Sequence, residues 1–399
     1  MAQFPTGSYI ILEGEKKATN FYIIKEGKVR LKRDRPVANE KFSETLGPGD
    51  FFGVIGAMSR YPQIESAVAM TNVSLISVSN NHFGELIQKN APIAMKIIRY
   101  FIIKLRQFGH STKAPQRIIT AEAAQEEDIE RLFEMGEYYF GEGHTESAAY
   151  CYQSYLKYLP KGPLSSKSRE RLMSLDKPFE LPMVDSSNRI YNNGEIVFLE
   201  SEPGSELFIV QGGRVKIVKM VGGQEVLLNI MKVGDIFGEM ALIDDQPRSA
   251  SAIAIDQVDL LAISKKNFES MSKTQPQLMS RIITLLSERI WNAYKLLANA
   301  MISDMNDRIA DMLLTLVEKN RVKIKPRETY NYNLTIEDFL KMLGLGIRDY
   351  PVMKKYLAMT KYVKLNGDVL VCTDLGLLEK TVLLHRDSQK AGKSGEHSK

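Results

Sequence analysis

An acidic and a basic side chain stand nine positions apart in the segment 237–252, and their chemistry suits a phosphorylated sugar. Glu239 follows Gly238 at the start of a short apolar run, and Arg248 follows Pro247, with Ser249 beside it. A carboxylate accepts a hydrogen bond from a sugar hydroxyl, and a guanidinium binds two phosphate oxygens at once. Backbone N–H groups at the start of a short helix add partial positive charge. The alternative is a surface loop in which Glu239 and Arg248 form a chance ion pair.

The order and spacing of these residues resemble the phosphate-binding segment of cyclic-nucleotide-binding domains. That motif reads Phe-Gly-Glu-Leu/Met-Ala-Leu, then a few polar residues, then Pro-Arg-Ser/Thr-Ala, and the segment from Phe237 to Ala252 follows it. The resemblance implies a small β jelly roll that binds cyclic AMP, with cyclic GMP as the alternative ligand. It implies ligand contacts from the following residues: Gly238, Glu239, Met240, Arg248 and Ser249.

The segment occurs twice, and the earlier copy lacks the charged groups. The two copies align at a constant offset of 185 positions, which places Gly53 on the motif glycine. In this register Val54 replaces the acid, Gln63 replaces the arginine and Ile64 replaces the serine. Arg60 and Glu65 lie nearby, outside the motif positions. A cyclic phosphate placed there would lose its guanidinium partner. We therefore expect the cyclic nucleotide to bind in the second domain only. The first copy is then a structural or interaction domain, and a different ligand is the alternative.

Length and composition limit the classes of protein. At 399 residues the chain should hold three or four domains. It contains no apolar run of about 18 residues and no charged start followed by an apolar stretch, so we expect neither a membrane span nor secretion. Cys151 and Cys372 lie far apart, as expected of reduced thiols in a cytoplasmic protein. A net charge of +5 permits nucleic-acid binding without arguing for it.

The sequence lacks the patterns of a catalytic or metal site. The five histidines are scattered, and no HExxH, CxxC, GxSxG or GxxxxGK(S/T) motif occurs. No segment combines a nucleophile, a general base and an activating partner. We expect no enzymatic activity and no metal.

Between the two copies, the sequence predicts a helical hairpin. Gly136 and Ala148 are small residues where two helices would cross, Tyr139 and Tyr152 would fill the groove, and Pro160 would close the second helix. Their spacing is that of one tetratricopeptide (TPR) repeat, so the hairpin is TPR-like. A single unit of this kind needs a neighbour to pack on. It is either a rigid spacer packed between the jelly rolls or a docking site for a protein partner.

The last third of the chain resembles the dimerisation helix and winged helix of the Crp/Fnr transcription regulators. Apolar residues recur at three- and four-residue spacing from Leu278 to Met301. In that family the equivalent helix pairs across a two-fold axis and covers the nucleotide, so the resemblance implies a homodimer. The positions that read the base in that family hold Ala293 and Tyr294 here. Tyr294 is a candidate to stack on or hydrogen-bond to a purine, with a packing role as the alternative.

Local signals support a winged helix after Asp304. Thr335 and Asp338 predict a capping box for a helix that ends at Gly344, and Arg321 to Tyr332 reads as short strands. The segment Asn366-Gly367 predicts the turn of a β-hairpin.

DNA contacts in this family come from the helix after the turn. Pro351 is incompatible with the middle of that helix, so the helix should begin late, with Asp349 as its cap and Pro351 in its first turn. The end of the helix that contacts DNA bases in this family would then have a different structure here. Four basic residues remain to hold DNA phosphates, or alternatively to form a solvated basic face: Arg348, Lys354, Lys355 and Lys361.

The sequence therefore predicts an α+β multidomain protein with two β-jelly-roll cyclic-nucleotide-binding domains, a helical hairpin insert, a long dimer helix and a winged helix. The expected parts are a degenerate cyclic-nucleotide-binding-like domain (1–112), the TPR-like hairpin and linker (120–176), a cyclic-nucleotide-binding domain (180–275), the dimerisation helix (276–303), a winged-helix domain (304–385) and a disordered tail (386–399). The expected function is a cyclic-nucleotide-responsive, homodimeric transcription regulator that binds DNA. The alternative is an effector or adaptor without sequence-specific DNA binding that acts through protein partners.

Overall fold

The chain forms two compact units. The computed structural model describes residues 1–16, 18–34, 37, 44–110, 121–175, 186–221, 223–240 and 247–394. Unit 1 consists of Met1–Leu86, Lys104–Thr112 and Ile283–Lys399, and unit 2 consists of Ile87–Ile103 and Lys113–Ile282. The division falls inside two long helices, α3 (Ala91–His110) and α9 (Pro276–Ala300), so each helix contributes residues to both units.

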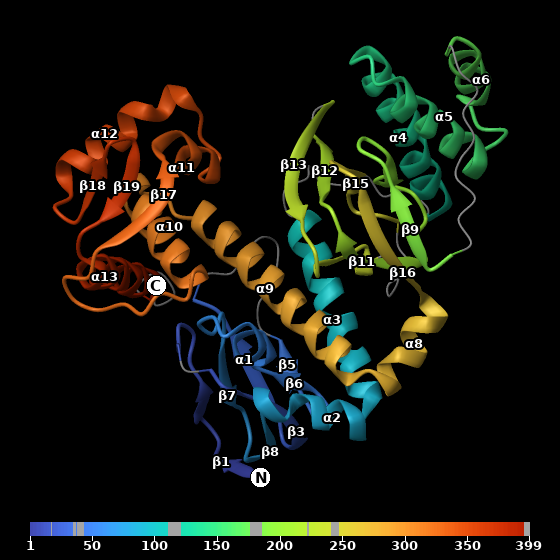
Figure 1. Ribbon diagram of the computed structural model, residues 1–399. Coiled ribbons are helices and arrows are strands. Elements are labelled where there is room, and N and C mark those ends of the chain that lie inside the picture. Colours follow the sequence, from blue (N-terminus) through green and yellow to red (C-terminus); the bar gives the residue numbers. More distant parts are fainter. Residues whose placement is uncertain are drawn as a thin grey trace. The chain divides into compact units, whose positions relative to one another are not determined.

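Unit 1 begins with two antiparallel four-stranded sheets, ordered β1-β8-β3-β6 and β2-β7-β4-β5 (Figure 1). Val29 and Leu31 of β4 alternate with more exposed residues, because successive side chains of a strand point to opposite faces. The inward residues of both sheets form one apolar core. The elements are β1 (Ala2–Phe4), β2 (Tyr9–Ile11), β3 (Asn20–Glu26), β4 (Val29–Lys32), β5 (Thr45–Leu46), β6 (Phe51–Phe52), α1 (Val54–Ser59), β7 (Ser66–Ala69), β8 (Val73–Ser79) and α2 (Phe83–Lys89).

Unit 2 contains a second pair of sheets with the same strand order, β9-β16-β11-β14 and β10-β15-β12-β13. Even the irregular register between β2 and β7 recurs between β10 and β15. Both pairs of sheets are consistent with jelly rolls, so the repeat seen in the sequence is a repeat of the fold. The elements are β9 (Asn188–Tyr191), β10 (Ile196–Phe198), β11 (Glu206–Gly212), β12 (Val215–Val221), β13 (Gln224–Met231), β14 (Ile236–Phe237), β15 (Ser251–Ala254), β16 (Val258–Ser264) and α8 (Lys265–Thr274).

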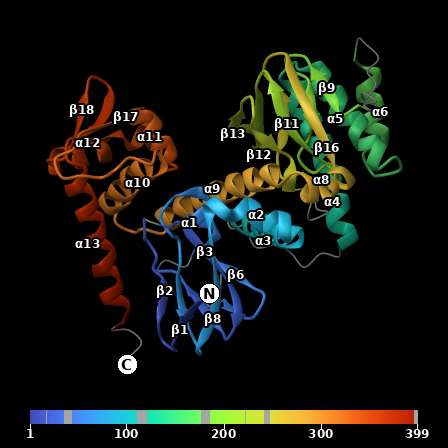
Figure 2. The ribbon, with the colours of Figure 1, turned by 60° about the horizontal axis from the view of Figure 1, so that its bottom comes forward.

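A helical hairpin of α4 (Ala121–Gly141) and α5 (Thr145–Tyr158), followed by α6 (Ser165–Met173), completes unit 2. The helices cross closely at Gly136, where a Cβ atom would lie only 2.5 Å from the Tyr152 ring. The hairpin shares an apolar cluster with Leu199, Val218 and Ile253 of the second jelly roll, and it lies against that jelly roll in Figures 1 and 2. The neighbour that the hairpin needs is therefore the second jelly roll.

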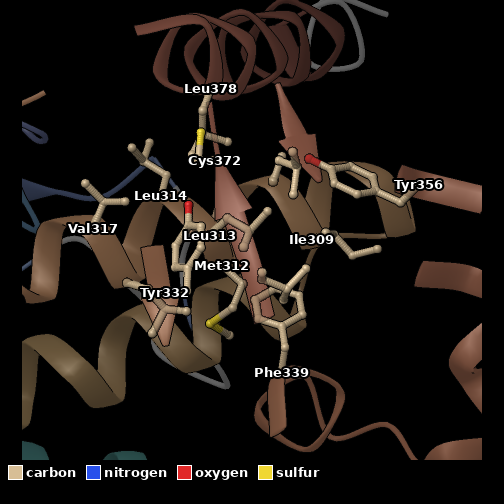
Figure 3. Close-up of a cluster of buried hydrophobic side chains, with 14 of the residues drawn as sticks. Ile309, Met312, Leu313, Leu314, Val317, Tyr332, Phe339, Tyr356, Cys372 and Leu378 are labelled. Carbon is tan, nitrogen blue, oxygen red and sulfur yellow. The ribbon is translucent and has the colours of Figure 1, made fainter. Parts of the chain in front are cut away.

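Unit 1 ends in a helical domain with a small sheet ordered β17-β19-β18. Its core gathers side chains such as Leu313, Phe339 and Tyr356 (Figure 3). The capping box between Thr335 and Asp338 is confirmed. The elements are α10 (Met305–Lys319), β17 (Tyr330–Thr335), α11 (Ile336–Met342), a 3-10 turn (Ile347–Asp349), α12 (Tyr350–Met359), β18 (Val363–Asn366), β19 (Val369–Cys372) and α13 (Leu375–Ser394).

Two details of this C-terminal domain differ from the sequence prediction. Strands were expected from Arg321 onward, but the only strand of that segment starts at Tyr330. Disorder was expected from residue 386, but α13 continues to Ser394, and residues 395–399 lie outside the described part. Within α13, Arg386 forms an ion pair with the buried Asp311 of α10, with an N–O distance of 2.8 Å.

The apolar stripe predicted around residues 276–303 lies on α9. Most of its inward face is buried within this single chain, including Met279, Ile282, Ile283, Leu286, Ile290, Trp291, Tyr294 and Ala298. Met301, the last residue of the predicted stripe, is 60% exposed. Of the helices that the structure describes, none is both long and apolar enough to cross a bilayer.

Candidate functional site

The site begins at the motif glycine, Gly238, which follows β14 of the second jelly roll and directly precedes the acidic residue Glu239. Strand β14 ends at Phe237, and Gly238 turns the chain with a φ of +77°, a conformation that favours glycine. A Cβ atom at Gly238 would lie 2.7 Å from Nη1 of Arg248, so the site also needs glycine for space. Glu239 follows in a helical turn and is 3% exposed. Residues 241–246 of the motif lie outside the described part of the chain.

The guanidinium of Arg248 is held in place without a ligand. Its Nη1 atom donates a hydrogen bond to the carbonyl oxygen of Gly238 over 2.6 Å, and its plane lies 4.1 Å from the ring centroid of Phe198. Burial lowers the pKa of Arg248 to about 10. The buried Nε atom has no hydrogen-bond partner among the described residues. A phosphate oxygen of a ligand would satisfy both this donor and the buried charge.

Backbone contacts fix the segment that carries Arg248. The Arg248 N–H donates to the carbonyl of Glu202, and the Ser201 N–H donates to the carbonyl of Arg248. Ser249 is exposed, and Nζ of Lys219 lies 3.0 Å from its carbonyl oxygen. Its hydroxyl lies 3.8 Å from the sulfur of Met240. The structure thus gathers five of the sequence-predicted ligand residues in unit 2: Gly238, Glu239, Met240, Arg248 and Ser249.

Tyr294, the sixth candidate, belongs to unit 1 instead. Its hydroxyl donates to Oε1 of Glu13 over 3.0 Å, and its ring lies 5.1 Å from the guanidinium of Arg33. Burial raises the pKa of Tyr294 well above its usual value, so the hydroxyl keeps its proton. Within this chain the residue therefore packs against the first jelly roll.

The first jelly roll keeps the backbone of the site but not its charges. Gln63 Nε2 donates to the carbonyl of Gly53 over 3.4 Å, at the same two positions as Arg248 and Gly238. Every residue of α1, including Val54, is buried. Sequence reasoning noticed Glu65 but not its partner: Nη2 of Arg33 lies 3.2 Å from Oε2 of Glu65, and both side chains are buried. No motif spacing links these two residues, because they lie 32 positions apart, Arg33 just after β4 and Glu65 just before β7.

The predicted DNA-binding residues lie around α12. As predicted, α12 starts late, with Asp349 as N-cap and Pro351 in its first turn. The Asp349 carboxylate accepts from the Gly346 N–H over 2.9 Å instead of capping its own helix. All four predicted basic residues are exposed: Arg348, Lys354, Lys355 and Lys361.

Both jelly rolls match a known family of domains. The sequence profile of the cyclic nucleotide-binding domain matches residues 1–90 and again residues 188–275. Two cyclic nucleotide-binding domains are present. Over the ranges that the structure covers, no cluster of His, Cys, Asp and Glu side chains could hold a metal ion.

Parts of the chain are similar to proteins whose names refer to cyclic AMP. The CRP-like cAMP-activated global transcriptional regulator of Mycobacterium tuberculosis (strain CDC 1551 / Oshkosh) is 27% identical over 185 residues, which cover 46% of this chain and 83% of the relative. The cyclic AMP receptor protein of Thermus thermophilus is 31% identical over 132 residues, or 33% of this chain and 61% of the relative. A solved structure of a CooA mutant from Carboxydothermus hydrogenoformans matches 49% of this chain and 87% of its own, with 18% identity and a TM-score of 0.38. The two sequence relatives support a Crp/Fnr-like, cyclic-nucleotide-responsive regulator.

Proposed function

We propose that this protein is a transcription regulator that binds cyclic AMP in its second jelly roll. The observation that carries this proposal is the buried guanidinium of Arg248, which is oriented by Gly238 and Phe198 and keeps an unsatisfied Nε donor. Glu239 lies one residue from Gly238 and supplies a carboxylate for the ribose 2'-hydroxyl. The ligand is named as cyclic AMP because one relative is named a cAMP-activated regulator and another a cyclic AMP receptor protein, and cyclic GMP is the alternative. The role is binding rather than catalysis.

The proposal places one nucleotide in each chain. Both jelly rolls match the domain profile, so the fold alone does not separate them. The side chains at the ligand positions do separate them, because Val54 and Gln63 of the first jelly roll provide neither an acceptor for the ribose hydroxyl nor a cation for the phosphate. Burying a phosphate beside them would leave its charge uncompensated. Tyr294 is not included among the proposed ligand residues, since its hydroxyl and ring have partners in unit 1.

We propose that the C-terminal domain is a winged helix and that the regulator acts by binding DNA through it. The order of α11, α12 and the β18–β19 hairpin fits such a domain, and exposed lysines line α12. Two chains in a homodimer would present two such domains to a palindromic site. A second candidate, an adaptor without sequence-specific DNA binding, is favoured by Pro351, which removes an N–H donor from the first turn of α12. That adaptor would use the hairpin or the first jelly roll to bind a protein.

Calorimetric titration with cyclic AMP and cyclic GMP tests the ligand. One site per chain is expected, and a protein that binds neither nucleotide would refute the proposal. A DNA mobility-shift assay at low salt, with and without the nucleotide, tests the output. If the DNA does not shift at low salt, with or without the nucleotide, the proposed DNA-binding regulator is refuted and the adaptor is the remaining candidate.

A further inference from the structure

The first jelly roll contains a buried ion pair at the edge where the second has its ligand groups. Strands β4 and β7 pair with Leu31 opposite Ala67 and Lys32 opposite Ser66, so Arg33 and Glu65 follow directly at the end of this ladder. Their charged atoms lie 3.2 Å apart, and the side chains are 1% and 6% exposed. Alternation along β4 places Arg33 on the same face as Leu31, which belongs to the apolar core.

This ion pair lies close in sequence to the position that corresponds to the phosphate-binding arginine of the second jelly roll. By the offset of 185, Glu65 stands where the second jelly roll has Ala250, two residues after the position of its phosphate-binding arginine. The second jelly roll thus offers a cation and leaves the anion to its ligand. The first jelly roll supplies both charges itself. Glu65 provides the anion, and Arg33, which follows β4, provides the cation. A buried charge of this kind needs such a partner, because an unpaired one would cost too much desolvation energy.

One aromatic side chain of α9 and one of α3 lie near the guanidinium of Arg33. The Tyr294 ring lies 5.1 Å from the guanidinium of Arg33, a cation–π contact, and the Phe108 ring of α3 lies 5.8 Å from it. One turn earlier in α9, Nε1 of Trp291 donates to the carbonyl of Pro62 over 3.0 Å. Trp291 is fully buried, and its ring lies 4.5 Å from that of Tyr61. These contacts fasten residues 290–294 of α9 to the segment that follows α1.

The C-terminal domain is attached to the same place. Arg321, just after α10, donates from Nη2 to the carbonyl of Ser59, the last residue of α1, over 3.0 Å. Its guanidinium also lies 4.9 Å from the ring of Tyr61 and forms an ion pair with Glu288 of α9. A cation at the end of α1 is favoured there by the free carbonyl groups.

We propose that the first jelly roll is a self-liganded domain, in which the Glu65 carboxylate held by Arg33 occupies the place of a ligand anion and keeps α9 bound without any nucleotide. The first jelly roll then serves as a fixed docking platform for the C-terminal domain. This inference deepens the one-site part of the proposed function, since it gives the reason why the first pocket takes no nucleotide.

The test uses intrinsic fluorescence of the full chain, because Trp291 is its single tryptophan. Glu65→Ala removes the internal anion from beside Arg33. The variant is expected to show a red-shifted Trp291 emission and a lower midpoint of thermal unfolding. Added formate, a small carboxylate, should return both readouts toward the wild-type values. Glu65→Gln keeps the shape of the side chain without its charge, and it should show a smaller red shift.

The matched control is the double variant Arg33→Ala/Glu65→Ala, which lacks the cation as well. Formate should not change its emission or its midpoint. Two results would overturn the inference: unchanged emission and midpoint in both Glu65 variants, or an equal response of the double variant to formate. If Glu65→Ala does not fold, Glu65→Gln decides by the same readouts. No nucleotide is used, so a protein that ignores cyclic AMP refutes the proposed function and leaves this inference standing.

Discussion

The guanidinium of Arg248 lies 4.1 Å from the ring centroid of Phe198, so the phosphate-binding cation of the second jelly roll is oriented before any ligand arrives. A preorganised side chain loses little conformational entropy when it binds. The first jelly roll lacks both members of this pair. Strand register places Ile11 where the second jelly roll has Phe198, and Gln63 stands in place of the arginine.

Replacing this arginine should remove nucleotide binding. Arg248→Ala is expected to weaken binding of cyclic AMP by about 3 kcal/mol or more, because a buried ligand charge loses its partner. Arg214→Ala is the control, since Arg214 forms an exposed ion pair with Asp256 on the same jelly roll. Calorimetry should show the wild-type dissociation constant for the control. Equal affinities of all three proteins would contradict the proposed site.

Replacing the exposed lysines of α12 should weaken DNA binding without changing its sequence preference. Lys354→Ala and Lys355→Ala should each lower the slope of log affinity against log salt by about 1, since each lysine would neutralise one phosphate. The measurement is a fluorescence-anisotropy titration at several salt concentrations. Lys232→Ala is the control, because Lys232 is exposed on unit 2. A slope that stays constant in both α12 variants would remove these lysines from the DNA interface.

The close helix crossing in the hairpin should tolerate no side chain at Gly136. Gly136→Ala puts a methyl group 2.5 Å from the Tyr152 ring, and such overpacking costs about 1–3 kcal/mol of unfolding free energy. Gly141→Ala lies in the same helix, where a Cβ atom meets nothing within 4 Å, and it should be neutral or stabilising by up to about 1 kcal/mol. Thermal unfolding of the two variants measures the difference. Equal midpoints would mean that α4 and α5 separate readily.

Stability should depend on pH through Glu202, which is 5% exposed. Burial raises the pKa of this carboxyl, so between its ordinary pKa and the raised value the folded protein binds more protons than the unfolded chain. Stability therefore falls as pH rises through this window. Glu202→Gln does not titrate, so the wild type should lose thermal stability relative to the variant as pH rises above the ordinary pKa of a glutamic acid, about 4.3. A wild type that gains stability over this range would show that the folded-state pKa is lowered instead.

Local patterns were readable because the interactions behind them span few residues. Gly238 and Arg248 lie ten positions apart in one segment, and Thr335 caps a helix through Asp338, three positions on. Pro351 predicted the late start of α12 by the same local logic, since it fixes its own backbone angle and lacks an N–H donor. The repeat of the jelly roll was also visible, because the two copies align at a constant offset of 185 positions.

Only the tertiary structure shows in which unit each side chain of α9 packs. An apolar stripe shows that a helix face is buried, but not which domain covers it. The sequence left Tyr294 as either a nucleotide contact or a packing residue, and within this chain its side chain contacts Glu13 and Arg33. The pairing of Arg33 with Glu65 likewise depends on two strands that meet only in the folded sheet. Burial and ion pairing depend on distances in space, and the sequence specifies those distances only for residues that are near one another along the chain.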